Sequence, residues 1–424
     1  VQDAIEELYD KTISDASCKN VSAPKLGEGL VPVTIENDGT VKYADTSKSW
    51  YNYCDKIWAN AVILEDNTGY KVGDTIQESD IQSYFVWIPK YKYKLWNVDT
   101  PSKGIHEIEI VFDETDTTDI EGVSCKTPMV SGESGNCNNG EYMTHPAFIS
   151  MNTNGFWVGK YETGYRGATS VATAQVNGSD SSKIIVKPNV YSWRNITVYN
   201  AFLASYNYDR DLDSHMMKNT EWGAVAYLSH SKYGLGYEVN INNNSNYKTG
   251  YSALPSTNQQ TYPGTSGDGA TYNSAYNTDI GYLASTSGNI SGVYDMPGGA
   301  WEYVSSYIIG KPGSSGFSTT TLANYDSKYF DVYNASSAIS TYQYRILGDA
   351  TGEMGPFKQY LDGDNNSRYH SSWYGDFSNF VDSSNPWFVR GGHYTYGVLS
   401  GAFIFLGYTG GTNAYGGFRL VLTP

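Results

Sequence analysis

The carboxyl-terminal stretch Trp387–Leu422, WFVRGGHYTYGVLSGAFIFLGYTGGTNAYGGFRLVL, decides how the rest of the chain is interpreted. Both of its ends, Trp387–Arg390 and Phe418–Leu422, alternate apolar with other residues beside glycine pairs, which predicts two strands. Residues 391–417 between them are mostly Gly, Tyr, Thr, Ser, Asn and aliphatic, with no Asp, Glu, Lys or Arg. Rigid tyrosines on adaptable glycine-rich backbone are the mixture that antibody paratopes use. We expect tyrosine-bearing loops on either side of a buried strand at 401–406.

The composition bounds the class of protein. The chain has 424 residues, 40% hydrophobic and only 17% charged, with 39 tyrosines. This length exceeds that of a domain with a single typical hydrophobic core. The sequence contains no run of eighteen apolar residues, so no membrane-spanning helix is predicted. A net charge of −16 argues against a nucleic-acid partner, because phosphates need clustered Lys and Arg. A polar, weakly charged surface favours an extracellular or cell-surface protein, or one on a phage virion; an acidic cytosolic protein remains an alternative.

The amino-terminal residues 1–13, VQDAIEELYDKTI, carry an apolar stripe at helical spacing. So short a helix needs a partner, which predicts a stalk end or an oligomer contact. Because the sequence begins at Val1 and has no signal-peptide pattern, we expect a mature or truncated form. The predicted division is 1–17 for the helix, 18–82 for a small β-rich addition and 83–424 for the main domain.

Four cysteines occur, Cys18, Cys54, Cys125 and Cys137. Cys125 and Cys137 bracket a loop rich in Gly, Ser and Asn, which favours a local disulfide and leaves Cys18 to pair with Cys54. Four cysteines allow three connectivities, so the other two stay open. The spacings contain no CxxC and no neighbouring histidine pair, which argues against zinc.

Several segments have the pattern of regular structure. Strands are predicted at 30–35, 39–43, 58–64, 84–89, 106–112 and 155–163, and helices at about 193–206 and from Asn219 or Thr220 to 228. Residues 239–281 lack periodicity and predict a long loop. The fold class is therefore α+β, with mixed sheets, two main helices and much irregular loop.

The order of these pieces resembles the formylglycine-generating-enzyme (sulfatase-modifying factor) family, whose fold is an elaborated C-type lectin. The matching segments run in the same order as in the family and cover about 85–422: VWIP at 86–89, His145-Pro146 with FWVGKYET at 156–163, TEW at 220–222, VYDMPGGAWEYV at 293–304, VRGG at 389–392 and GFRL at 417–420. The resemblance implies a C-type lectin fold over 83–424, behind an N-terminal helix and a small β addition. Fold alone does not give function.

The sequence departs from the family's catalytic pattern. Oxidising members use a cysteine pair near the carboxyl end to hold copper, and here no cysteine follows Cys137. Related ergothioneine-synthesis enzymes need clustered histidines for iron, and the six histidines show no such cluster. GxSxG and P-loop motifs are also missing. We therefore predict that the protein is not an enzyme and needs no cofactor; a metal or redox enzyme of the parent family ranks third.

Non-catalytic relatives of the family include the variable proteins of diversity-generating retroelements, and gut Firmicutes surface proteins are also similar. In the variable proteins, the last segment of the lectin domain carries residues that are varied by mutagenesis at adenines, and it ends in a strand that resembles Gly-Phe-Arg. Residues 391–419 resemble such a segment. One sequence leaves open whether the segment is diversified or belongs to a fixed adhesin.

The predicted ligand-binding residues are aromatic anchors with adaptable polar neighbours, which make hot spots on proteins or stack on sugars. They are His393, Tyr394, Thr395, Tyr396, Leu399, Phe403, Phe405, Leu406, Tyr408, Asn413 and Tyr415, with Trp373 and Tyr374 nearby in the sequence. At least one of Phe403 and Phe405 is expected to face the core. Trp222 and Trp301 are predicted core residues. Arg390 and Arg419 are predicted to form buried pairs, with Glu302 and Asp295 as candidate partners.

Two acidic runs offer oxygens at alternating positions, as calcium prefers. They are Asp209, Asp211 and Asp213, and Asp362, Asp364 and Asn366. Both lack the glycine and glutamate of an EF-hand loop, so any calcium is expected to be structural.

The leading hypothesis is a surface-displayed adhesin that binds a protein or glycan on another cell or host through the last segment. The alternative is a structural subunit of a pilus-like filament or phage tail fibre that assembles through its N-terminal helix and is decorated by the lectin domain.

Overall fold

The computed structural model describes residues 20–66, 69–94, 107–113, 142–253, 274–334, 346, 348–351, 358–360, 369–371 and 373–424. Several predictions fall outside these residues and stay predictions. They concern the helix at 1–13, the cysteines Cys18, Cys125 and Cys137, and the second acidic run, Asp362, Asp364 and Asn366.

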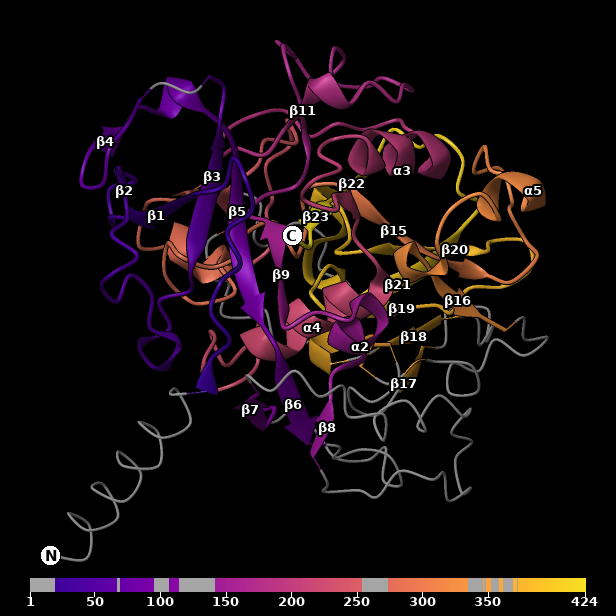
Figure 1. Ribbon diagram of the computed structural model, residues 1–424. Coiled ribbons are helices and arrows are strands. Elements are labelled where there is room, and N and C mark those ends of the chain that lie inside the picture. Colours follow the sequence, from indigo (N-terminus) through magenta and orange to yellow (C-terminus); the bar gives the residue numbers. More distant parts are fainter. Residues whose placement is uncertain are drawn as a thin grey trace, which may run out of the picture.

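Two large sheets dominate the described part of the chain, the first antiparallel and the second mixed, which confirms the α+β class (Figure 1). The first sheet has the order β12-β23-β9-β5-β3-β1-β2-β4. Its strands are β1 (Val31–Ile35), β2 (Val41–Tyr43), β3 (Asn60–Leu64), β4 (Thr75–Ile76), β5 (Ile81–Pro89), β9 (Gly155–Gly159), β12 (His215–Met216) and β23 (Leu420–Leu422). β5 and β9 are almost wholly buried and carry continuous apolar runs, as central strands do.

The second sheet has the order β16-β15-β20-β21-β19-β18-β17, and β22 pairs with β15 beside this path. Its strands are β15 (Trp301–Ile308), β16 (Asp331–Tyr333), β17 (Lys358–Tyr360), β18 (Tyr369–Ser371), β19 (Phe377–Ser378), β20 (Trp387–Arg390), β21 (Phe405–Tyr408) and β22 (Gly416–Phe418). In Figure 1 the indigo strands of the first sheet and the orange and yellow strands of the second lie on opposite sides of the carboxyl terminus.

Smaller sheets and short helices complete the described structure. The sheets are β6 (Tyr91–Lys94) with β7 (Ile110–Phe112) and β8 (Tyr142–Thr144), β10 (Gly164–Tyr165) with β11 (Ile184–Ile185), and β13 (Tyr251–Ser252) with β14 (Ser274–Ala275). The helices are α2 (Pro146–Met151), α3 (Val198–Tyr206), α4 (Asn219–Ser229) and α5 (Thr319–Leu322). All of α4 is buried, so it is a central helix without a polar face. None of the described helices is long and apolar enough to cross a membrane.

The chain passes from the second sheet to the first at Arg419. Phe418 ends β22, which runs parallel to β15, and Leu420 begins β23, which pairs with β9 and β12. The Arg419 guanidinium forms two hydrogen bonds with the Glu302 carboxylate on β15, 2.8 and 2.5 Å long. It also donates to the Gly159 carbonyl on β9 at 2.9 Å. One side chain therefore joins the two sheets, as the predicted pairing of Arg419 with Glu302 required.

The strand predictions are confirmed for β1, β2, β3, β5, β9 and β20, with ends that differ by a few residues. The first predicted helix begins later, at Val198, because Thr197 caps it by accepting the Asn200 N–H and Asn195 has a left-handed backbone with φ of 59°. The predicted boundary at 82/83 lies inside β5, and β1–β4 pair into the same sheet as β5. The described part of the predicted addition is therefore an extension of the main sheet.

Removing the Arg419 guanidinium leaves Glu302 buried without its partner. We expect Arg419→Ala to lower the free energy of unfolding by about 3–5 kcal/mol, measured by chemical denaturation. The matched control is Arg166→Ala, which breaks the half-exposed pair with Glu65 and should cost less than about 1 kcal/mol. Equal losses in the two variants would contradict the role given to Arg419.

Candidate functional site

The two ends of the carboxyl-terminal loop are fixed on either side of one strand. β20 and β22 flank the first half of β15, with Arg390 opposite Glu302 and Gly416 opposite Trp301. The Trp301 N–H donates to the Tyr415 carbonyl at 2.8 Å, and the Tyr394 N–H donates to the Gly299 carbonyl at 3.0 Å. The loop 391–415 is therefore presented from a rigid frame rather than from a free tether.

The turn before β15 positions Trp301 through buried carboxyl groups. Gly299 has φ of +59°, and a Cβ there would lie 2.1 Å from Glu162 Oε1, so the position requires glycine. Glu162 Oε1 accepts the Ala300 N–H at 2.8 Å, and Asp295 accepts the Gly250 N–H at 2.8 Å. Burial and the nearby carboxylates of Asp295 and Glu302 raise the pKa of Glu162 well above its usual range.

Aromatic rings gather at the start of β15. The His393 ring stacks on Tyr415 with centroids 4.6 Å apart and planes 11° apart, and it meets Tyr396 edge-on at 4.5 Å. Tyr396 in turn packs edge-on against Trp301 at 5.3 Å. His393 is 6% exposed and Tyr415 is 45% exposed. We call the group His393, Tyr394, Tyr396 and Tyr415 the aromatic surface; Trp301, 4% exposed, belongs to the core beneath it, as predicted.

Two further residues support the aromatic surface from loops that the sequence did not single out. The buried Arg194 guanidinium lies 3.7 Å from the Tyr247 ring centroid, and the Tyr247 ring lies 4.9 Å from that of Tyr394. Arg194 also donates to the carbonyls of Ala414 and Val171. Arg194 falls at the start of the helix predicted at about 193–206 and Tyr247 in the loop predicted at 239–281, and neither pattern indicates a contact with the carboxyl-terminal segment.

Thr395 and Asn413 shape the loop backbone. The Thr395 hydroxyl lies 2.9 Å from His393 Nδ1, and Asn413 Oδ1 accepts the Tyr415 N–H at 2.9 Å. Such local side-chain bonds fix a turn. Both side chains contact the predicted tyrosines or histidine, so the structure brings these residues together.

The remaining predicted residues lie elsewhere. Leu399, Leu406 and Tyr408 are half-buried, and the Tyr408 ring lies 6.3 Å from Tyr303 on the second sheet.

Phe403, Phe405 and Trp373 are 0%, 0% and 2% exposed, which corrects the prediction that they contact a ligand. Phe403 packs between Trp373 and His230, with centroids at 5.7 and 4.6 Å. Tyr374 is half-buried and its ring lies 5.6 Å from that of His230. Both phenylalanines of this segment therefore face the core, which agrees with the prediction that at least one would.

Arg390 is buried as predicted, but its predicted partners are wrong. Its guanidinium donates to the carbonyls of Asp349 and Ala350 at 3.4 and 3.2 Å instead of to Glu302 or Asp295. Burial lowers its pKa to about 10. Trp222 is a core residue as predicted, and its indole N–H donates to the Ala402 carbonyl at 2.8 Å.

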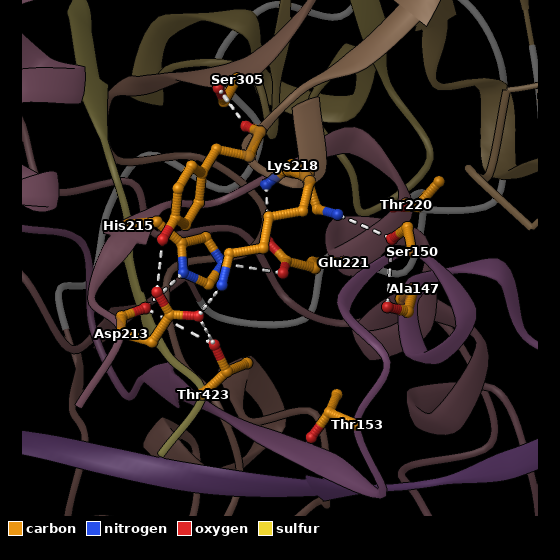
Figure 2. A network of polar contacts seen from close by, with 12 residues as sticks. Ala147, Ser150, Thr153, Asp213, His215, Lys218, Thr220, Glu221, Ser305 and Thr423 are labelled. Carbon is orange, nitrogen blue, oxygen red and sulfur yellow. Dashed lines mark hydrogen bonds and ion pairs between the residues drawn. The ribbon is translucent and has the colours of Figure 1, made fainter. Parts of the chain in front are cut away.

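Asp213, the last residue of the first acidic run, lies in the polar network of Figure 2. Asp213 accepts bonds from Lys328, Arg210 and Thr423 at 2.6, 3.2 and 3.0 Å, and Asp209 Oδ1 accepts the N–H of Asp211 at 3.1 Å. Protein donors thus already bond to oxygens of Asp213 and Asp209, and the structural calcium stays a prediction. Within the described ranges no three His, Cys, Asp or Glu side chains are placed to share a metal ion.

The same network holds the start of α4. His215 Nε2 lies 2.9 Å from Glu221 Oε1, with both side chains fully buried, and Glu221 Oε2 accepts the Lys218 N–H at 2.8 Å (Figure 2). The N-cap position is Lys218, one residue before the predicted cap. Glu221 therefore caps α4 from inside the core.

Cys54 lies in the short 3-10 turn Tyr53–Asp55 and is not a free thiol. The other three cysteines lie outside the described residues, so the predicted connectivity stays a prediction.

The burial of His393 leads us to expect that the stability of the fold depends on pH. Burial lowers its pKa to about 4, against about 6.5 in an unfolded chain. Its contribution to stability is therefore complete above about pH 6.5 and is lost as the pH falls towards 4, because only the unfolded chain takes up the proton in that window. NMR titration of the His393 imidazole should give a pKa well below 6.5. A value near 6.5 would show that the ring is open to water and the stack is absent.

No protein-family model and no curated protein sequence matches the chain. The predicted membership of the formylglycine-generating-enzyme family therefore stays a prediction. Similar solved structures include "Major Tropism Determinant I1 Variant", with TM-score 0.28 and 13% identity over 95% of this chain and 74% of that one. Another is "Major Tropism Determinant P3c Variant", with TM-score 0.27, 13% identity and the same coverage. At these TM-scores we base no conclusion about fold or function on the likeness.

Proposed function

We propose that the protein is a non-catalytic, adhesin-like binding protein of the extracellular or cell surface, or of a phage virion, with a C-type lectin fold of formylglycine-generating-enzyme type. It binds a protein or glycan on another cell through the aromatic surface. The observation that supports this most is the stack of His393 on Tyr415, held on a loop whose two ends pair with the same strand.

Aromatic rings that are already fixed in place lower the entropic cost of binding a ligand. A ligand that meets preordered side chains does not have to immobilise them, and interface tyrosines lose little side-chain entropy. The rings of His393, Tyr396 and Trp301 already hold one another, while Tyr415 remains exposed. The aromatic surface is therefore suited to recognition.

The aromatic surface contains neither the cysteine pair nor the histidine cluster that the enzymes related to the formylglycine-generating-enzyme family use to hold a metal. The surface consists of rings and hydroxyls, and the segment 391–417 contains no carboxylate, lysine or cysteine. His393 has a pKa near 4 and is neutral at pH 7, so it is not an acid catalyst there.

Diversification by a retroelement is part of the proposal. Of the residues at which the segment resembles a varied one, Thr395 and Tyr415 are exposed and Leu399, Leu406, Tyr408 and Asn413 are half-buried. The backbone is held by hydrogen bonds of the main chain, so many side chains could be exchanged without loss of the frame. A reverse transcriptase gene beside a near-copy of the coding DNA for 391–419, differing at adenines, is the expected genomic context.

Truncating Tyr415 should abolish most of the binding. We expect Tyr415→Ala to weaken binding to hits from a glycan array and from a library of displayed extracellular domains by about 30-fold, the size of a hot-spot loss of about 2 kcal/mol. The measurement is surface plasmon resonance on the full chain.

The matched control is Tyr237→Ala, because Tyr237 is 52% exposed and lies outside the aromatic surface. Its affinity should equal that of the wild type. If both variants bind the ligand with the affinity of the wild type, or if only Tyr237→Ala loses affinity, the binding site lies elsewhere.

A further inference from the structure

A pocket of about 380 Å³ lies at the other end of the described chain, in the loop between β2 and β3. It is lined by Trp50, Tyr51 and Tyr53, by the polar residues Thr46, Lys48, Ser49 and Asn52, and by Val21. This volume is within the range of small-molecule sites. No residue of the aromatic surface lines it.

The pocket wall is preformed. Asn52 and Ile57 exchange two backbone hydrogen bonds of 2.8 Å, and Asn52 Oδ1 accepts the Cys54 N–H at 3.0 Å. Tyr53 is buried and its hydroxyl donates to the Trp87 carbonyl on β5 at 2.6 Å. The rings of Trp50, Tyr51 and Tyr53 pack edge-on in series, 5.2 and 5.9 Å apart. The loop is thereby anchored to the core of the first sheet.

The polar groups that remain open can all donate a hydrogen bond, and the two hydroxyls among them can also accept one. Among the described residues, no hydrogen bond is made by the Trp50 indole N–H, the Tyr51 hydroxyl or the Thr46 hydroxyl. Lys48 reaches only Asp45, at 3.1 Å, and 78% of its side chain is exposed. No carboxylate lines the pocket. A half-buried indole beside a tyrosine, with donors around it, calls for a ligand with one apolar face and a rim of acceptor oxygens.

We propose that this pocket binds a pyranose sugar, as a second site separate from the aromatic surface. The C–H face of the ring packs on Trp50 and Tyr51, since aromatic side chains offer a large apolar face. The ring oxygens accept from the Trp50 indole N–H, the Thr46 hydroxyl and the Lys48 ammonium. A carboxylate on the sugar would add an ion pair to Lys48, so neutral and acidic sugars are separated by the experiment.

The test is saturation-transfer NMR on the full chain with the methyl glycosides of glucose, galactose, mannose, N-acetylglucosamine and glucuronate. Each is used at about 10 mM, which detects millimolar affinity. We expect at least one sugar to bind and Trp50→Ala to weaken it about tenfold or more, as loss of a stacking ring does. Thr46→Val and Lys48→Met, on the exposed rim, should each weaken binding severalfold without affecting the fold. A larger Lys48→Met effect on glucuronate than on glucose identifies an acidic sugar.

Tyr415→Ala separates this inference from the proposed function. Sugar binding that survives Tyr415→Ala and is lost in Trp50→Ala supports the second site, whatever the aromatic surface binds. Binding that is lost in Tyr415→Ala and kept in Trp50→Ala overturns it. So does the absence of binding by all five sugars, or rim variants that bind as the wild type does.

Discussion

The buried pair of Arg419 and Glu302 is the interaction on which the described structure depends most. A guanidinium with no exposure must be met by charge and by acceptors, because an unpaired buried ion is very costly. Glu302 lies on β15 and the Gly159 carbonyl on β9, so satisfying Arg419 brings the two large sheets together. The chain crosses from β22 to β23 at the residue that contacts both partners.

That junction also sets the geometry of the aromatic surface. β15 lies between β20 and β22, and these two strands are the ends of the loop 391–415. With both ends on one strand, the loop has little freedom to separate them. The rings of His393, Tyr396 and Tyr415 then restrict one another, and Arg194 and Tyr247 support them from below. Rigidity of the surface is thus a consequence of sheet pairing, with the aromatic contacts added to it.

Much of this could be predicted from sequence alone, because alternation of apolar residues reports which strands are half-buried. The strands predicted at 30–35, 58–64 and 387–390 are found at 31–35, 60–64 and 387–390, and the buried pair of Arg419, predicted separately, is also confirmed. Burial of at least one of Phe403 and Phe405 was predicted, but alternation could not settle both, because Phe403 lies outside any strand and only Phe405 is on the buried face of β21. The supports Arg194 and Tyr247 were not predicted, since long-range contacts between loops leave no periodic signal.

The account's central claim is that the sheet junction holds the loop, and amide hydrogen exchange tests it directly. In the wild type, the amides of Trp301, Tyr394 and Gly416 should be protected, because they donate to the backbone carbonyls of Tyr415, Gly299 and Asn413 respectively. Arg419→Lys keeps the positive charge but loses the bidentate hydrogen bonds to Glu302. In this variant the three amides should exchange faster, while the amides of β1–β3 keep their protection. Unchanged protection at Trp301, Tyr394 and Gly416 in that variant would contradict the claim.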